Sequence, residues 1–110
     1  LLPNPDLLDH FEDPATALPF ARICARFFLK DFFLEENQLL KNVGRIANIP
    51  GIIVQGRHDI CTPPGAAWAL AKAWPKGDLW IVHDAGHSAS EPGIIDGLVR
   101  ATDHFAGAPR

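Results

Sequence analysis

The feature that most constrains the fold is a pair of short apolar runs separated by a helical pattern. The Ile-Ile-Val run at residues 52–54 and the Leu-Trp-Ile-Val run at 79–82 are bounded by turn residues, which is typical of strands buried on both faces. An apolar helical face follows each run. The first face consists of Ala67, Leu70, Ala71 and Trp74, and the second of Ile94, Ile95, Leu98, Val99, Thr102 and Phe105. This strand–helix–strand–helix order predicts an α/β fold with parallel strands and helices packed on the sheet. Two parallel strands are too few to stand alone, so we expect them to belong to a larger sheet.

Capping and breaking signals predict where the helices begin and end. Asp13-Pro14 begins the first helix, and Pro19 argues against one unbroken helix from there. Gly44 weakens a second helix near residues 39–47. Thr62 and Ser90 are the expected caps of the helices that follow the two strands. The first helix has an apolar and aromatic stripe, formed by Phe20, Ile23, Cys24, Phe27 and Phe28.

Composition and charge exclude several classes of partner. The 110 residues carry a formal net charge of −3, without the basic face that nucleic-acid binding requires. No apolar run approaches the roughly 20 residues that span a bilayer, so we expect no membrane partner. Two cysteines, Cys24 and Cys61, make no disulfide framework and favour unpaired thiols in a reducing, cytoplasmic compartment.

Two residues that could carry chemistry follow the two predicted strands. Asp59 lies in Gly-Arg-His-Asp and His87 in Ala-Gly-His-Ser, 28 residues apart, which is enough for one strand–helix–strand crossover. Open α/β sheets place their sites at the carboxyl ends of the strands, so the two side chains should meet. An imidazole accepts protons near neutral pH, and a carboxylate on its other nitrogen fixes its tautomer. We therefore predict that His87 is a catalytic base and Asp59 its acid partner.

Other interpretations of these residues remain open. Asp59 alone could be a turn residue or an ion-pair partner of Arg57, and His87 alone could be an ordinary loop histidine. A metal site formed by His58, Asp59, His83 and His87 is disfavoured, because the spacing of four between His83 and His87 falls on a strand end and a glycine loop. We expect no metal and no organic cofactor.

No residue of the chain fits the nucleophile that such a pair serves. In α/β-hydrolases the chain order is nucleophile, acid, base, and the nucleophile lies in a G-x-S-x-G turn. The only serines, Ser88 and Ser90, lie beside His87 outside such a motif, and Cys61 on the acid loop is a poor candidate. The chain also begins with Leu1 and contains no Met, so we expect a truncated start.

Several stretches together resemble the C-terminal part of the prolyl aminopeptidases, also called proline iminopeptidases, a family of α/β-hydrolases. The more specific of them are Lys-Ala-Trp-Pro at 72–75, Gly-His-Ser-Ala-Ser-Glu-Pro at 86–92 and Ala-Thr-Asp-His-Phe-Ala at 101–106. The resemblance implies a serine peptidase that releases N-terminal proline from small peptides. It implies that residues 1–30 end a helical cap and that residues 31–110 form the C-terminal part of the hydrolase core.

One position departs from the family pattern. After Ala-Arg-Ile at 21–23 the family usually has a glutamate that binds the substrate's free amino group, and here Cys24 stands in its place. Three hypotheses therefore remain. The full-length protein is a prolyl-aminopeptidase-like serine hydrolase, or it is an esterase or other α/β-hydrolase, or the chain is a non-catalytic truncated remnant. In the first two, the 110-residue piece needs the N-terminal part that bears the nucleophile and is inactive alone.

Overall fold

A computed structural model of the protein describes residues 13–107, which divide into two compact units. One unit ends at Gln38 and the other begins at Leu39, and each is described by itself. The first contains α2 (Pro14–Phe28) and the 3₁₀ helix η1 (Asp31–Phe33). The second contains, in order, α3 (Gln38–Asn42), the 3₁₀ helix η2 (Val43–Ile46), β1 (Gly51–Gly56), α4 (Pro64–Ala73), β2 (Gly77–Val82) and α5 (Pro92–Ala106), with α3 starting at the boundary. The expected loop at residues 1–12 lies outside the described residues.

Helix α2 begins at a capped terminus. The carboxylate of Asp13 accepts hydrogen bonds from the N–H of Ala15 at 3.0 Å and from the hydroxyl of Thr16 at 3.1 Å. The helix then continues through Pro19 to Phe28, so the predicted interruption at Pro19 was wrong. A proline lacks one backbone donor, which removes a single hydrogen bond, and the turns on both sides still hold the helix.

The aromatic stripe of α2 is exposed within its own unit. None of the fifteen residues of the helix is buried, and Phe28 is 68% exposed. Its end packs against η1, where Phe27 meets Phe33 edge to face at 5.4 Å and Phe28 meets Phe32 at 4.9 Å between ring centroids. The sequence correctly predicted an amphipathic helix, and the packing it finds here is local.

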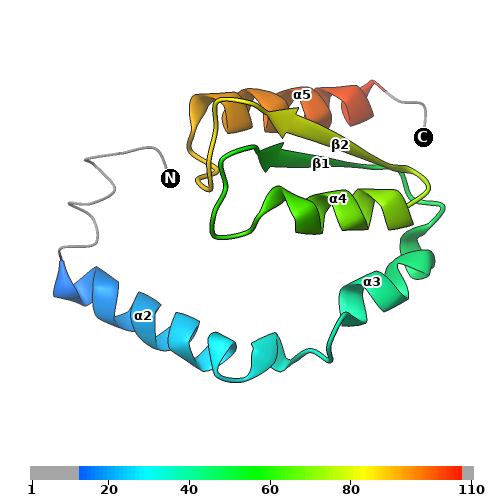
Figure 1. Cartoon of the computed structure of the whole chain (residues 1–110). Coiled ribbons are helices and arrows are strands. Elements are labelled where there is room, and N and C mark those ends of the chain that lie inside the picture. The colour runs from blue at the N-terminus through cyan, green and yellow to red at the C-terminus, as the bar shows by residue number, and fades with distance from the viewer. Residues whose placement is uncertain (1–12, 108–110) are drawn as a thin grey trace. The chain divides into compact units, whose positions relative to one another are not determined.

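The second unit is a small α/β layer structure, which confirms the predicted class. Strands β1 and β2 are parallel, with partners running from Gly51 and Gly77 at one end to Gly56 and Val82 at the other. Figure 1 shows α4 on one face of this two-stranded sheet and α5 on the other. In β1 the residues from Gly51 to Gln55 have intermediate burial, and no residue of β2 is buried, because each strand has a paired neighbour on one side only.

Close packing of α5 on the sheet depends on a glycine. A Cβ atom on Gly97 would lie 2.8 Å from a methyl carbon of Val54, closer than real Cβ contacts come. The buried apolar residues of the described chain are few, namely Val43, Ala85, Ile94 and Ala101. Other members of the predicted apolar face of α5, including Ile95 and Val99, remain about half exposed, at 48% and 52%.

Trp74 ties the opposite end of the sheet together. Its indole N–H donates to the backbone carbonyls of Ile46 and Ile49, both at 3.0 Å. Its rings fill the space beside Gly51 and Gly77, where added Cβ atoms would lie 2.0 and 2.8 Å from them. The sequence placed Trp74 on the apolar face of α4, whereas the structure makes it the residue that ends that helix.

The second predicted helix changes type near Gly44, as its weak helix propensity indicated. Helix α3 ends at Asn42 and continues as the 3₁₀ helix η2 from Val43. Among residues 13–107, no helix has both the length and the apolar character needed to cross a bilayer.

Candidate active site

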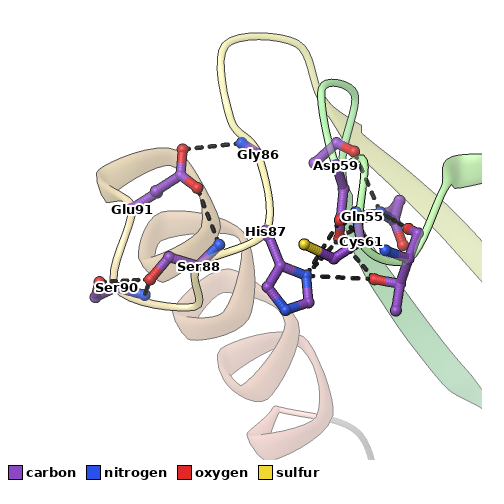
Figure 2. A network of polar contacts seen from close by, with 10 residues as sticks. Gln55, Asp59, Cys61, Gly86, His87, Ser88, Ser90 and Glu91 are labelled. Atoms are coloured by element: carbon purple, nitrogen blue, oxygen red, sulfur yellow. Dashed lines mark hydrogen bonds and ion pairs between the residues drawn. The ribbon is translucent and has the colours of Figure 1, made fainter. Parts of the chain in front are cut away.

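The loops that follow β1 and β2 lie side by side at the carboxyl end of the sheet. The N–H of Arg57 donates to the carbonyl of Val82, and the N–H of His58 donates to that of Ala85, each at 2.9 Å. At Gly56 the two loops approach so closely that a Cβ would lie 2.0 Å from the carbonyl oxygen of Gly86. This contact brings the predicted residues Asp59 and His87 together (Figure 2).

Asp59 is held from several directions. Its side chain is only 6% exposed. One carboxylate oxygen accepts from the N–H groups of Cys61 and Thr62, both at 2.9 Å. The other accepts from the Thr62 hydroxyl at 2.7 Å and from the amide of Gln55 at 3.3 Å. The loop after β1 is therefore folded around this one carboxylate.

The hydrogen bonds keep Asp59 ionised. Burial alone would raise the pKa of its carboxyl group, because a low-dielectric environment disfavours the charge. The backbone and hydroxyl donors of Thr62, together with His87 and the N–H of Cys61, outweigh burial and hold the pKa of Asp59 well below its ordinary value. An ionised carboxylate can only accept hydrogen bonds, so it requires donors around it.

His87 supplies one of those donors. Its Nδ1 lies 3.1 Å from both carboxylate oxygens of Asp59. Because the carboxylate only accepts, we assign the proton of a neutral imidazole to Nδ1, which leaves Nε2 with a free lone pair. The side chain is 43% exposed, so a substrate or nucleophile can approach the ring. The arrangement can fix an imidazole as a proton acceptor.

Cys61 comes closer to the pair than the sequence indicated. Its sulfur, a ligand oxygen of Asp59 and a ring nitrogen of His87 lie within 4.8 Å of one another, the one such cluster found among residues 13–107. Metal binding there would displace hydrogen bonds that already satisfy Asp59. His58 is not part of this cluster, and the Nδ1 of His83 instead lies 3.3 Å from the guanidinium of Arg57.

Two residues that bond Asp59, Thr62 and Gln55, were not identified as site residues from the sequence, and two of the expected helix caps were wrong. Thr62 was predicted to cap α4, but the residue at that position is Pro63, and the Thr62 hydroxyl bonds Asp59 instead. Ser90 was predicted to cap α5, but Glu91 takes that place, and the Ser90 hydroxyl pairs with that of Ser88 at 2.7 Å. Gln55 was hidden inside a strand pattern.

A pocket of about 270 Å³ opens beside the pair. Its polar wall comes from the two site loops and its apolar wall from β1 and α5. The lining residues are Val54, Gln55, Gly56, Asp59, Thr62, Gly86, His87, Ala89, Ile94 and Leu98. Small-molecule sites combine apolar walls with convergent polar groups, and this pocket has both.

Fold and site together define an α/β protein with a carboxylate–imidazole pair at the carboxyl edge of parallel strands. Comparison with known proteins makes this specific, and it confirms the resemblance seen in the sequence. The chain is similar to the C-terminal part of proline iminopeptidases, which are α/β-hydrolases. It is 54% identical over 101 residues to the proline iminopeptidase of Xylella fastidiosa, covering 91% of this chain and 32% of the relative.

Relatives from other organisms agree. The proline iminopeptidase of Xanthomonas citri is 52% identical over 102 residues, and that of Arabidopsis thaliana is 49% identical over 104 residues. These matches cover 92% and 94% of this chain, and 33% and 27% of the relatives. The chain thus spans about a third of the length of the curated relatives it matches. No model of a protein family matches it.

Proposed function

We propose that the full-length protein, meaning the natural polypeptide that contains these residues, is a serine hydrolase that releases N-terminal proline from small peptides. The observation that carries the proposal is the Asp59–His87 pair, joined at 3.1 Å beside an open pocket. Support also comes from the similarity to proteins named proline iminopeptidase, at 54% identity for the Xylella protein.

In the proposed mechanism, a serine from the upstream part of the protein attacks the carbonyl carbon of the N-terminal residue. His87 removes the hydroxyl proton through Nε2, and Asp59 steadies the imidazolium that forms. The same proton then passes to the leaving amine as the amide bond breaks and an ester to the serine remains. Water, deprotonated by His87, hydrolyses that ester and regenerates the serine. No metal or organic cofactor takes part in these steps.

The proposal assigns the two parts of the chain different places in the whole protein. Residues 31–110 are the C-terminal part of the α/β-hydrolase core, and residues 1–30 are the end of a helical cap. The partner of both is the N-terminal part that bears the nucleophile. The half-covered sheet and the exposed face of α2 are consistent with this, since both leave apolar surface to be buried elsewhere.

Cys24 bears on the choice of substrate. It lies on α2 with a partly exposed, unpaired thiol, at the position where the family has a glutamate for the free amino group. A neutral side chain cannot balance an ammonium ion, which favours an esterase or another amide hydrolase as the second candidate. We expect Cys24→Glu to raise kcat/KM for a prolyl amide and to leave the turnover of a simple ester nearly unchanged.

The test of the proposed function is hydrolysis of proline 4-nitroanilide and of 4-nitrophenyl acetate by the full-length protein. We expect turnover of the prolyl amide by the wild type and its loss in His87→Ala, with His104→Ala on the surface of α5 as the matched control. Cleavage of the ester alone would replace the peptidase with an esterase. A full-length wild type that neither hydrolyses these substrates nor reacts with a fluorophosphonate would favour a non-catalytic remnant.

Two further parts of the proposal concern the chain itself. The 110 residues alone should neither hydrolyse the amide nor react with the fluorophosphonate, because the nucleophile is elsewhere. We also propose a cytoplasmic location, supported by the free thiols of Cys24 and Cys61. Secretion of the full-length protein with an oxidised Cys61 would contradict it.

A further inference from the structure

Glu91 makes a contact that its place in the fold does not require. It is the residue that precedes the first turn of α5, and a side chain there usually accepts from the helix's own N–H groups. Glu91 makes no such bond. Its carboxylate instead reaches back along the chain, where one oxygen accepts from the N–H of Gly86 at 2.8 Å and the other from the N–H of Ser88 at 3.0 Å.

These two donors are the backbone groups on either side of His87. Figure 2 shows the Glu91 carboxylate bridging them while the imidazole points the other way, toward Asp59. The N–H of Ser88 lies in the peptide that directly follows His87, and the N–H of Gly86 lies in the peptide one residue before it. A carboxylate that holds both restrains the backbone from which the His87 side chain projects. Bonds from neutral donors to a charged carboxylate are among the stronger ones in proteins.

The rest of the loop holds Glu91 in place. Its own N–H donates to the carbonyl of Ser88 at 3.1 Å, and Pro92 fixes the start of α5 immediately after it. The hydroxyl of Ser88 accepts from the N–H of Ser90 at 3.2 Å. The loop from Gly86 to Glu91 is thus closed by its own hydrogen bonds, and the His87 side chain projects from it toward Asp59.

We infer that Glu91 is a positioning residue for the base: its carboxylate holds the backbone around His87 so that the imidazole stays in register with Asp59. The Glu91 carboxylate bonds the backbone and not the imidazole, so it acts through the two N–H groups from which it accepts. The inference rests on the proposed function for its catalytic consequence, whereas the effect on the Asp59–His87 contact does not depend on which substrate is cleaved.

The experiment compares Glu91→Gln, Glu91→Ala and Asp103→Asn in the full-length protein with proline 4-nitroanilide. Glutamine has the same shape but offers one acceptor oxygen, so one of the two N–H groups loses its partner. We expect kcat to fall about tenfold in Glu91→Gln and about 100-fold in Glu91→Ala with little change in KM, because displacement of the base impairs chemistry more than binding. Asp103→Asn, an exposed acidic residue twelve positions along the same helix, should leave both constants unchanged.

A second readout follows the contact itself. The Nδ1 proton of His87, shared with Asp59, should give a far-downfield proton NMR resonance in the wild type, which is lost or broadened in Glu91→Gln. A wild-type kcat with the resonance retained in Glu91→Gln would overturn the inference. A lower kcat, a higher KM and a lower Tm with the resonance retained would also overturn it, because that combination indicates general destabilisation. A wild type without amidase activity would remove the proposed function, while loss of the resonance in Glu91→Gln would still support the positioning role.

Discussion

Helix α2 has fifteen residues and none of them is buried, whereas the two short loops after β1 and β2 bury Asp59 and Ala85 almost completely. The helix is held by its own backbone and a cap, and its apolar face has little to pack on within its unit. The loops have almost no apolar core and are held by hydrogen bonds to two carboxylates, those of Asp59 and Glu91. The geometry of the site therefore depends on hydrogen bonds between near neighbours, whereas nothing within its own unit buries α2.

The largest expected effect tests whether the carboxylate of Asp59 does more than hold its loop. Asp59→Asn in the full-length protein should lower kcat for the prolyl amide by about 10⁴, because an amide can present its NH₂ to Nδ1 and favour the wrong tautomer of His87. Steady-state kinetics at neutral pH measure this. A loss below about tenfold would mean that the loop, and not the charge, is what matters.

A second change tests the close approach of the two loops. Gly56→Ala places a methyl group about where the Gly86 carbonyl oxygen lies, at 2.0 Å, and backbone cannot rotate away as a side chain can. We expect a loss of about 3 kcal/mol or more in the free energy of unfolding, by denaturant titration of the full-length protein. Gly65→Ala, where nothing lies within 4 Å, is the control and should not destabilise the protein. Equal stability of the two variants would show that the loops can separate.

A third prediction concerns pH. The lowered pKa of Asp59 means that its charged form stabilises the folded state at all pH values above the ordinary carboxyl pKa of about 3.9. This contribution is lost as the pH falls from there through the lower folded pKa. The stability difference between wild type and Asp59→Asn should therefore be constant near neutral pH and shrink in acid. A difference that grows below pH 4 would contradict the assignment of an ionised, hydrogen-bonded carboxylate.

The smallest expected effects fall on the exposed face of α2 and its end. Leu29 is 81% exposed at the end of the helix, so Leu29→Lys should change the free energy of unfolding by less than about 0.5 kcal/mol. Ile94→Ala, at a position only 7% exposed, should cost about 2 kcal/mol or more. Thermal melts of both variants in the 110-residue chain compare them, and a large cost at Leu29 there would contradict its exposure. A larger cost at Leu29 in the full-length protein than in this chain would show that the N-terminal part covers the end of α2, as the proposed function requires.

The sequence predicted the strands, their parallel order and the meeting of Asp59 with His87, because each depends on strong local patterns. The sequence-based predictions were wrong where a local signal could be outweighed by other contacts. Thr62 and Ser90 look like helix caps in isolation, yet their hydroxyl groups bond Asp59 and Ser88. Pro19 looks like a helix breaker, yet its helix continues. No local pattern predicted the hydrogen bonds of Glu91, because its carboxylate comes next to the N–H groups of Gly86 and Ser88 only once the loop has turned.

The crossover through α4 joins both site loops in one covalent stretch, and every hydrogen bond that holds Asp59 to His87 lies between Gln55 and Glu91. A cut or a fusion joint placed near residue 38, where the chain divides into its two units, would sever none of them. In a split-protein reporter built on the proposed triad, the segment from Leu39 onward would carry Asp59 and His87 together. Signal would then depend on recruitment of the part that is proposed to carry the nucleophile.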